Sequence, residues 1–323
     1  MKYKKRINRR RAKKQNIIII CSFVTVLLCL SFGYAAFSTN INVVVRGNIY
    51  KASDKCYTTS DNGDGTLTIT NYDAGCGSEV SIPSTIKGKV ITKIGGNNWD
   101  SNSSFAYKGL TKVVIPDTVV SIGLNSFRSN NIVSLDLGNF VQKIGWEAFL
   151  GNKLTNIVLP SSLTEVGPEV FEENKLTSIP SLEYINTLGR GAFTGNLVKG
   201  DGRFVYQKNG DITDYTTLNS YAGDWISELI IPANVKTLVY YSLRFTRAEV
   251  VTLSDGLETI EDFAFTQSYA TTVNIPSTIK TIGPSVFSQS VAVKTINIDR
   301  KENAISGAPW EAKNATVNWI GDN

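Results

Sequence analysis

Residues 110–131 read LTKVVIPDTVVSIGLNSFRSNN, and the same framework returns as IVSLDLGNFVQKIGWEAFLGNK at 132–153 and LTNIVLPSSLTEVGPEVFEENK at 154–175. These three repeats of 22 residues follow one another without a gap. Apolar residues recur at positions 4, 6, 10, 13 and 18, and glycine recurs at position 14. One repeat cannot bury its apolar side alone, whereas stacked repeats can, so the periodicity predicts a solenoid.

The spacing also predicts the path of the chain within one repeat. Positions 4 and 6 lie on one face of an extended strand, while positions 3 and 5 face the other way. A proline at position 7, as in Pro116 and Pro160, lacks the N–H that a further ladder bond needs and should end the strand. The glycine at position 14 is expected to permit a tight bend. The aromatic residue at position 18 should fill the wide end of the coil.

The frame extends in both directions to nine repeats, with repeats 1–5 in residues 80–196 and repeats 6–9 in residues 226–310. In the first repeat either Trp99 or Phe105 can fill the aromatic position. Residues 197–225 do not match the frame, and their alternating aromatic residues and Asn-Gly-Asp turn predict an inserted β-hairpin or Ω-like loop.

The pattern LxxVxIPxxVxxIGxxxFxxxx resembles the BspA-type leucine-rich repeat of bacterial surface proteins over about residues 80–310. This resemblance implies an α/β repeat solenoid with one parallel strand per rung. It also implies adhesion to host or bacterial proteins or glycans through a face of the solenoid. Four positions depart from the pattern, namely Val239, Glu261 and Ser306 at position 14 and Leu243 at position 18.

Both flanks are predicted to cap the solenoid, because its end rungs expose core and unpaired strand edges. Residues 54–79 are expected to form an N-terminal capping hairpin, and residues 311–323 a C-terminal cap with Val317 and Trp319 as the apolar pair of a last strand. The turn DNGDG in the first cap resembles a calcium loop, but Gly63 stands where such a loop needs an oxygen ligand.

The cysteines fall into two pairs. Cys56 and Cys76 bracket the first hairpin, and in an exported chain they are a candidate disulfide, with two free thiols as the alternative. Cys21 and Cys29 lie inside an apolar run and are interpreted as apolar filler.

The N-terminus predicts export. Residues 1–16 form a basic n-region whose nine lysines and arginines contribute +9, so the rest of the chain carries −4 against a total of +5. The folded part therefore lacks the basic surface that nucleic-acid binding requires, and no nucleic-acid partner is expected.

Residues 17–37 carry no charge and fit either a signal peptide or an uncleaved transmembrane anchor, followed by a linker at 38–53. In both cases the positive-inside rule places the repeats outside, secreted or anchored in the plasma membrane. A DNA-binding basic arm is the disfavoured alternative, because such an arm would not abut a segment of membrane-spanning length.

Catalytic motifs are scarce. The chain contains no histidine, which excludes Ser-His-Asp, Cys-His and histidine-based metal sites. We expect no catalytic residue, no cofactor and no metal, although a glycan-cleaving enzyme needs only two carboxylates. The carboxylates near positions 14–20, which we expect on a solvated outer turn, are Glu147, Glu169, Glu172, Glu173, Glu261 and Asp262.

The candidate functional regions are therefore surfaces. The outward strand positions supply Val114, Asp136, Val158 and Ile230 as candidate partner-binding residues. The apolar ones, Val114, Val158 and Ile230, either mark a partner-binding patch or are ordinary β-formers. The insertion supplies Tyr215 and Trp225, which either contact a partner or belong to a structural hairpin that bridges repeats 5 and 6. A protein or glycan partner is the favoured interpretation. The alternative is a structural envelope or matrix component that self-associates.

Overall fold

The computed structural model describes residues 54–95 and 104–321 of the 323-residue chain. The predicted n-region, hydrophobic segment and linker lie outside the described residues, as does Trp99. None of the helices found in the described ranges combines the length and the apolar character that crossing a membrane requires. All described residues belong to the compact unit Ile49–Asn323.

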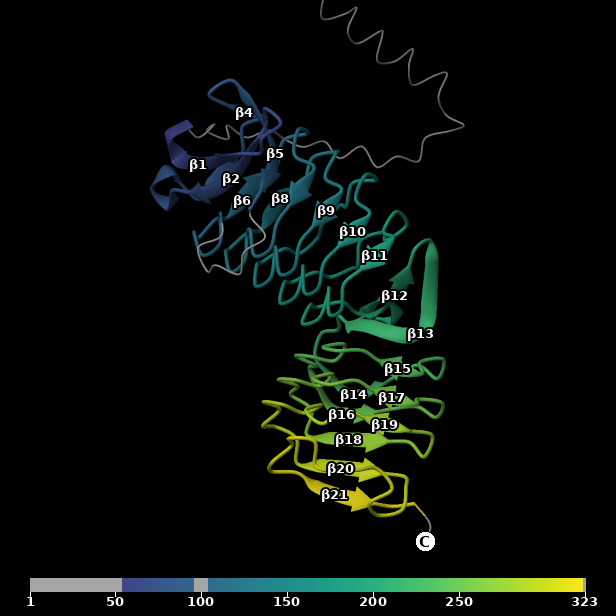
Figure 1. Cartoon of the computed structure of the whole chain (residues 1–323). Helices are drawn as coiled ribbons and strands as arrows, with labels where there is room; N and C mark the ends of the chain where they lie inside the picture. Colours follow the sequence, from purple (N-terminus) through teal and green to yellow (C-terminus); the bar gives the residue numbers. More distant parts are fainter. Residues whose placement is uncertain (1–53, 96–103, 322–323) are drawn as a thin grey trace, which may run out of the picture. The chain divides into compact units, whose positions relative to one another are not determined.

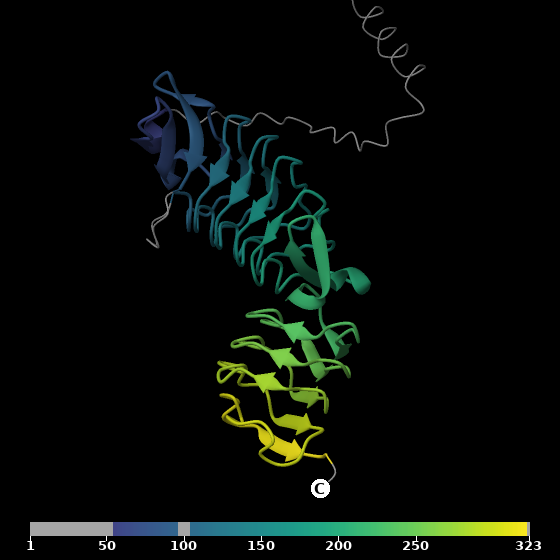
Figure 2. The ribbon, with the colours of Figure 1, turned by 45° about the vertical axis from the view of Figure 1, so that its right-hand side comes forward.

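This unit is a solenoid of about 11 turns with repeats of about 22 residues, in which strands of successive turns lie side by side (Figures 1 and 2). One sheet of 13 strands includes a strand from most turns, in the order β1-β2-β5-β7-β9-β10-β11-β12-β13-β15-β17-β19, with β4 against β5. Its strands are β1 (Tyr57–Asp61), β2 (Leu67–Tyr72), β4 (Thr85–Ile86), β5 (Lys89–Ile94), β7 (Ser121–Ile122), β9 (Lys143–Ile144), β10 (Glu165–Val166), β11 (Thr187–Leu188), β12 (Phe204–Asn209), β13 (Ile212–Tyr221), β15 (Thr237–Leu238), β17 (Thr259–Ile260) and β19 (Thr281–Ile282).

Two further parallel sheets form a second column of strands. Their strands are β3 (Glu79–Ser81), β6 (Lys112–Val114) and β8 (Ser134–Asp136) in one sheet, and β14 (Ile226–Ile230), β16 (Ala248–Thr252), β18 (Thr272–Ile275), β20 (Thr295–Ile298) and β21 (Thr316–Trp319) in the other. The sequence analysis predicts one strand per rung, and the strands of this second column lie at the predicted positions. The long sheet lies instead at positions 12 and 13, mostly as strands of two residues, and the repeat at 154–175 has no strand at positions 3–6.

The expected helical component is wrong for the described residues, which contain no α-helix. Their helices are three short 3-10 segments, namely η1 (Asp54–Cys56), η2 (Ala74–Cys76) and η3 (Asp201–Arg203). The reason lies in positions 16 and 20 of the repeat, which adopt left-handed backbone angles. Examples are Glu147 at φ 54° and Gly151 at φ 68° in one repeat, and Glu169 at φ 55° and Glu173 at φ 52° in the next. Such residues cannot lie inside a right-handed helix.

The predicted apolar framework forms the core. The rings of Phe105, Phe127, Phe149, Phe171 and Phe193 are fully buried, and the centroids of successive rings lie 4.8 to 5.8 Å apart. Phe105 fills the aromatic position of the first repeat. Aromatic stacking at this separation adds to the area that each ring removes from water.

A ladder of buried asparagines at position 21 accompanies the phenylalanines, and the sequence analysis did not identify it. The Nδ2 of Asn152 donates to the carbonyl oxygens of Phe149 in its own rung and Phe127 in the preceding rung, both at 3.0 Å. Its Oδ1 accepts from the backbone N–H of Ile132 at 3.1 Å. The same pattern holds at Asn130, Asn174 and Asn196. These side chains satisfy the backbone groups that the turn leaves unpaired.

The glycine at position 14 has a different role from the one expected. Gly145, Gly167 and Gly189 do not adopt a positive φ, so the bend does not require them. Instead, a Cβ at Gly145 or Gly167 would lie 2.8 Å from a backbone nitrogen of the preceding rung, and one at Gly189 would lie 2.1 Å from the nitrogen of Pro168. Glycine is needed there because neighbouring rungs approach each other closely.

The insertion is built into the long sheet. Strands β12 and β13 form an antiparallel hairpin. β12 pairs with β11 at Asn209 and Thr187, and β13 pairs in parallel with β15 at Leu218 and Leu238. The hairpin therefore connects repeat 5 to repeat 6, which agrees with the interpretation of residues 197–225 as a bridging hairpin.

The N-terminal hairpin of β1 and β2 continues the long sheet through β5. A disulfide joins Cys56 to Cys76, whose Cα atoms lie 6.0 Å apart. The carboxylates of the DNGDG turn are used locally. Asp61 accepts from the backbone N–H of Gly63 and pairs with Lys89, and Asp64 accepts from the hydroxyl of Thr66.

Candidate functional site

Three outward side chains of the first half lie in one column, with an acidic residue between two apolar ones. Val114 on β6 pairs in register with Asp136 on β8, and Val158 occupies the same position one repeat further on. Val158 is 69% exposed, Asp136 is exposed and Val114 is half-buried. The structure thus brings together three of the predicted residues: two apolar side chains with a carboxylate between them.

Ile230 lies apart from this group. It is 56% exposed on β14, which belongs to a different sheet, and its partner on the next strand is Thr252. From Thr252 onward the outward column is polar. The hydrogen bonds of this outward amide ladder run from Asn318 to Asn297 (2.9 Å), from Asn297 to Asn274 (2.8 Å) and from Asn274 to Thr252 (3.1 Å). Sequence reasoning missed this ladder, although the three asparagines recur at the repeat spacing.

A shallow groove of 610 Å³ lies beside this ladder. Its lining combines amide and carboxylate groups with apolar side chains, including Asn274, Asn297, Asp299 and Ile320. Polar groups of this kind can hydrogen-bond the hydroxyls of a sugar, while the apolar residues can contact its less polar face.

The two predicted aromatic residues of the insertion are both 61% exposed but do not form one site. The carbonyl of Tyr215 accepts from Asn234, which follows β14, and the ring of Tyr215 meets that of Tyr206 edge-on at 5.2 Å. Trp225 immediately precedes β14. The length of this strand therefore separates the two side chains.

The expectation that the carboxylates of positions 14–20 lie on a solvated turn is wrong for Glu169 and Glu172. Glu169 is 2% exposed and Glu172 is fully buried. Stacked rungs enclose this side of the turn, so the two side chains point at neighbouring rungs rather than at water. A dissolved substrate has no access to either carboxylate in this arrangement.

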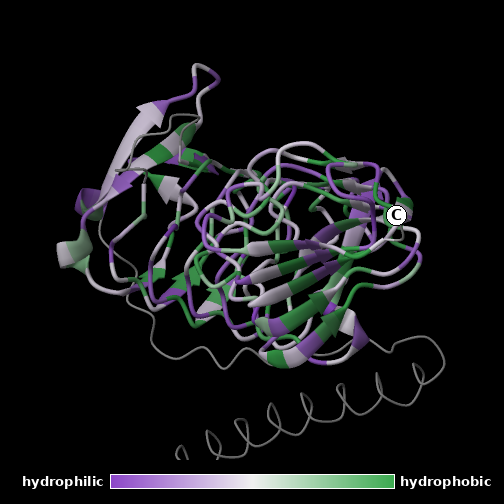
Figure 3. Cartoon of the chain, turned by 90° about the horizontal axis from the view of Figure 1, so that it is seen from below, coloured by the Kyte–Doolittle hydropathy of each residue, from purple (hydrophilic) through white to green (hydrophobic). Residues whose placement is uncertain are grey.

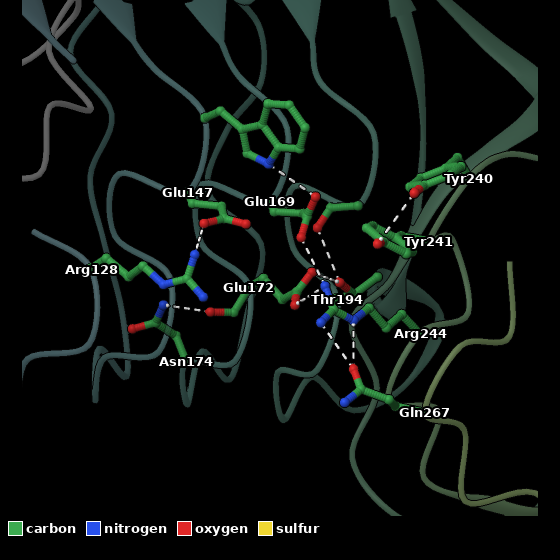
Figure 4. A network of polar contacts seen from close by, with 12 residues as sticks. Arg128, Glu147, Glu169, Glu172, Asn174, Thr194, Tyr240, Tyr241, Arg244 and Gln267 are labelled. Carbon is green, nitrogen blue, oxygen red and sulfur yellow. Dashed lines mark hydrogen bonds and ion pairs between the residues drawn. The ribbon is translucent and has the colours of Figure 1, made fainter. Parts of the chain in front are cut away.

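Arg244 holds the two buried glutamates (Figure 4). Its Nη1 lies 2.8 Å from the Oε2 of Glu169 and 2.9 Å from the Oε1 of Glu172, and its Nε and Nη2 donate to the Oε1 of Gln267. The guanidinium also lies over the ring of Tyr241 at 4.6 Å. We call Arg244, Glu169 and Glu172 the Arg244 bridge.

The bridge connects two parts of the solenoid. One apolar core extends from Cys56 to Ala222 and a second from Leu218 to Ala312, and the bridge spans the boundary with partners 75 residues apart in sequence. The intervening repeat places Gly191 beside the bridge, where a Cβ would lie 3.2 Å from that of Tyr241 and 3.5 Å from the Cγ of Glu169. No periodic signal could reveal this contact, because it crosses the insertion.

Burial controls the protonation of the bridge. Removal from water raises the pKa of Glu172 to about 8, with Arg244 opposing the rise and the nearby Glu169 adding to it. Burial also raises the pKa of Glu169, against the effects of Arg244 and of the indole N–H of Trp146, which donates to Glu169 at 3.0 Å. One cation cannot fully compensate two buried carboxylates, so Glu172 retains a proton near neutral pH.

We therefore expect stability to fall as pH rises from about 4.5 to about 8, since the folded chain binds more protons than the unfolded chain over this window. Glu172→Gln, which stays neutral, should flatten the slope. Calorimetric melting of both proteins at a series of pH values measures the difference. Glu165→Gln is the matched control, because Glu165 lies at the surface with its side chain 47% exposed. If the Glu172→Gln protein shows the wild-type slope, the burial argument fails.

The fold and the outward strand surfaces define a leucine-rich-repeat solenoid. The sequence profile of the BspA type leucine rich repeat region matches residues 101–200 and 216–313 in six copies. The chain belongs to this family, whose members are typically cell-surface proteins.

The chain is also similar to solved structures. The chain is similar to a leucine-rich repeat protein from Eubacterium ventriosum, with 25% identity, a TM-score of 0.57 and coverage of 84% of this chain and 77% of that one. It is also similar to the pneumococcal vaccine antigen PcpA, at 18% identity and a TM-score of 0.47, with 82% and 83% of the two chains covered. A leucine rich cell surface protein from Faecalibacterium prausnitzii aligns at 19% identity and a TM-score of 0.38, over 84% and 95% of the two chains. No curated protein matches the sequence.

Proposed function

We propose that this chain is an exported cell-surface protein that binds a protein or glycan partner without catalysis, through the outward strand surface of its solenoid. The observation that carries the proposal is the exposure of Val158, at 69%, beside Asp136 on a surface that the core does not use. Exposed apolar side chains grouped on one surface are a feature of partner-binding sites. Membership of a family of cell-surface repeat proteins supports the same function.

The chemistry of this surface favours a protein partner with a basic group between two apolar ones. Val114 and Val158 offer area that a partner can remove from water, at about 25 cal/mol per Å². Asp136 lies between them and offers a charge that a lysine or arginine of the partner can pair with. For a glycan partner, the groove beside Asn274 and Asn297 is the better candidate.

Export follows from the basic n-region and the uncharged residues 17–37. Cleavage near Ala36 would release the repeats, and an uncleaved segment would keep them on the outer side of the plasma membrane. N-terminal sequencing of the mature protein distinguishes the two forms.

A binding screen against surface proteins and glycans tests the proposal. For the protein partner, Val158→Lys should weaken binding by about tenfold or more, since a buried lysine must lose its water. Val133→Lys is the matched control, because Val133 is 56% exposed but lies outside the outward column. Its effect should be less than about twofold.

The remaining variants separate the other candidate surfaces. Loss of binding with Trp225→Ala, and not with Val158→Lys, would move the site to the insertion. Loss with Asn297→Ala alone would assign a glycan to the groove. Unchanged affinity in all three variants would contradict binding by these surfaces.

A further inference from the structure

Strand β21 is an edge of the second five-stranded sheet, and within residues 54–95 and 104–321 no strand pairs with its outer side. Hydrophobic and hydrophilic residues alternate along the strands seen from this end of the chain (Figure 3). Val317 and Trp319 are half-exposed, whereas Ile296 and Ile298, their partners on β20, are fully buried. The described residues thus leave the outer side of β21 uncovered, and an open parallel edge of this kind is a template for a further strand.

The outward amide ladder has a direction that leaves an acceptor at this edge. Each asparagine donates its Nδ2 toward the preceding rung, from Asn318 to Asn297 and from Asn297 to Asn274. The Oδ1 of Asn318 accepts no hydrogen bond from any described residue. A further strand with asparagine in register would donate to this oxygen and extend the ladder, as stacked asparagines do in extended β-assemblies.

The chain contains one further segment with the required pattern. Triplets in which asparagine stands between two apolar residues larger than alanine occur at four places in the sequence: 273–275 (VNI), 296–298 (INI), 317–319 (VNW) and 41–43 (INV). The first three lie on β18, β20 and β21. The fourth lies in the N-terminal linker and continues into Val44 and Val45, which favour strands.

We propose that residues 39–45 of a second copy add to the open edge of β21 as a parallel strand, with Asn42 beside Asn318, so that copies join end to end. A copy cannot use its own segment. Eleven residues separate Val43 from Asp54 and span at most about 40 Å, whereas about 11 turns at roughly 4.8 Å place β21 about 50 Å away. The inference goes beyond partner binding, because joining through β21 leaves Val158 and Asp136 free.

The outer edge of β21 offers a specific way to block the contact. The backbone N–H of Thr316 donates to the carbonyl of Lys294, the residue before β20, and that of Ile320 donates to the carbonyl of Ile298 on β20, at 2.8 Å each. Alternate residues of a strand point their N–H groups to opposite sides, so Val317 faces the open edge. Val317→Pro therefore removes a donor to the added strand while the bonds to β20 remain. Val317→Ala loses a similar side chain but keeps the N–H, and is the matched control.

The test titrates a fluorescent peptide of residues 38–46 into the full-length chain. We expect saturable binding to the wild-type and Val317→Ala proteins, and binding at least about tenfold weaker to Val317→Pro. A peptide with Asn42→Asp, which lacks the amide donor, should also bind at least about tenfold more weakly. Equal binding to Val317→Pro and wild type, or no saturable binding up to about 1 mM, would overturn the proposal.

A second measurement does not depend on substitutions in the solenoid. Ile41→Asp with Val43→Asp changes only the linker, so the melting temperature should stay at the wild-type value. Sedimentation analysis of the full-length protein should show oligomers for wild type and their loss in this variant. Oligomers that persist in the variant would contradict the proposal. Neither result depends on the ligand screen, because no partner is added.

Discussion

Replacing Phe149 by alanine should reduce the free energy of unfolding by about 3–5 kcal/mol, the range found for large buried aromatic residues. The ring is fully buried and lies between those of Phe127 and Phe171, at 5.1 and 5.8 Å. In a solenoid each rung contacts only its neighbours, so the cavity weakens two interfaces at once. Urea unfolding followed by circular dichroism measures the change.

The matched control is Asp136→Ala, on the outward face of β8 in the same repeat. This side chain is exposed, so its loss should cost less than about 0.5 kcal/mol. Equal destabilisation by the two substitutions would contradict the assignment of inward and outward positions on which the candidate surface depends.

Arg244→Met should cost about 3–5 kcal/mol at a pH of about 8, because removing the cation leaves buried carboxylates without compensation. The loss should be smaller at a pH of about 5, since Glu172 is then protonated in the folded protein. Thermal melting at both pH values measures the difference. Arg190→Met is the control, because the side chain of Arg190 is 56% exposed and lies 3.4 Å from Glu261. An ion pair at the surface contributes little to the free energy of unfolding.

A triple variant separates charge from packing. When Arg244→Met is combined with Glu169→Gln and Glu172→Gln, no buried charge remains, and most of the lost stability should return. An Arg244→Met protein as stable as wild type at the higher pH would show that the bridge does not join the two cores.

The sequence predicted the apolar frame because each inward position repeats its chemistry at a fixed spacing. Phe127, Phe149 and Phe171 at position 18, and the alternation around Val113 and Ile115, follow from the period alone. The structure confirms these residues as core. It also places the insertion in the sheet, which a break in periodicity can indicate but not describe.

Other features were missed for distinct physical reasons. The long sheet at positions 12 and 13 uses strands of two residues, too short to show alternation. The buried ladder of Asn130, Asn152, Asn174 and Asn196 was visible as a polar residue at constant spacing. It was overlooked because a repeated polar residue is ordinarily assigned to the surface.

The Arg244 bridge could not be predicted from the repeat. Its three residues occupy ordinary positions, and the contact joins residues on either side of the insertion. The candidate surface could be predicted from the sequence only in part. The period identified Val114, Asp136 and Val158 as outward residues, but only the structure shows that Ile230 belongs to a separate sheet.

Partner binding and end-to-end joining use different parts of the molecule. The outward column around Val158 lies along the side of the solenoid, whereas β21 is the edge strand of the second five-stranded sheet. An assembly joined through β21 would present many copies of the outward column, and repeated weak contacts can add up to strong attachment.

Display of the solenoid outside the cell is the central claim, and labelling of intact cells with a membrane-impermeant amine reagent tests it most directly. Lys143 and Lys280 have side chains 61% and 65% exposed, so both should react on intact cells. The lysines of the basic n-region should react only after lysis, if that segment is retained. Mass spectrometry of the labelled peptides gives the answer. Labelling of Lys143 and Lys280 that requires lysis would contradict the account.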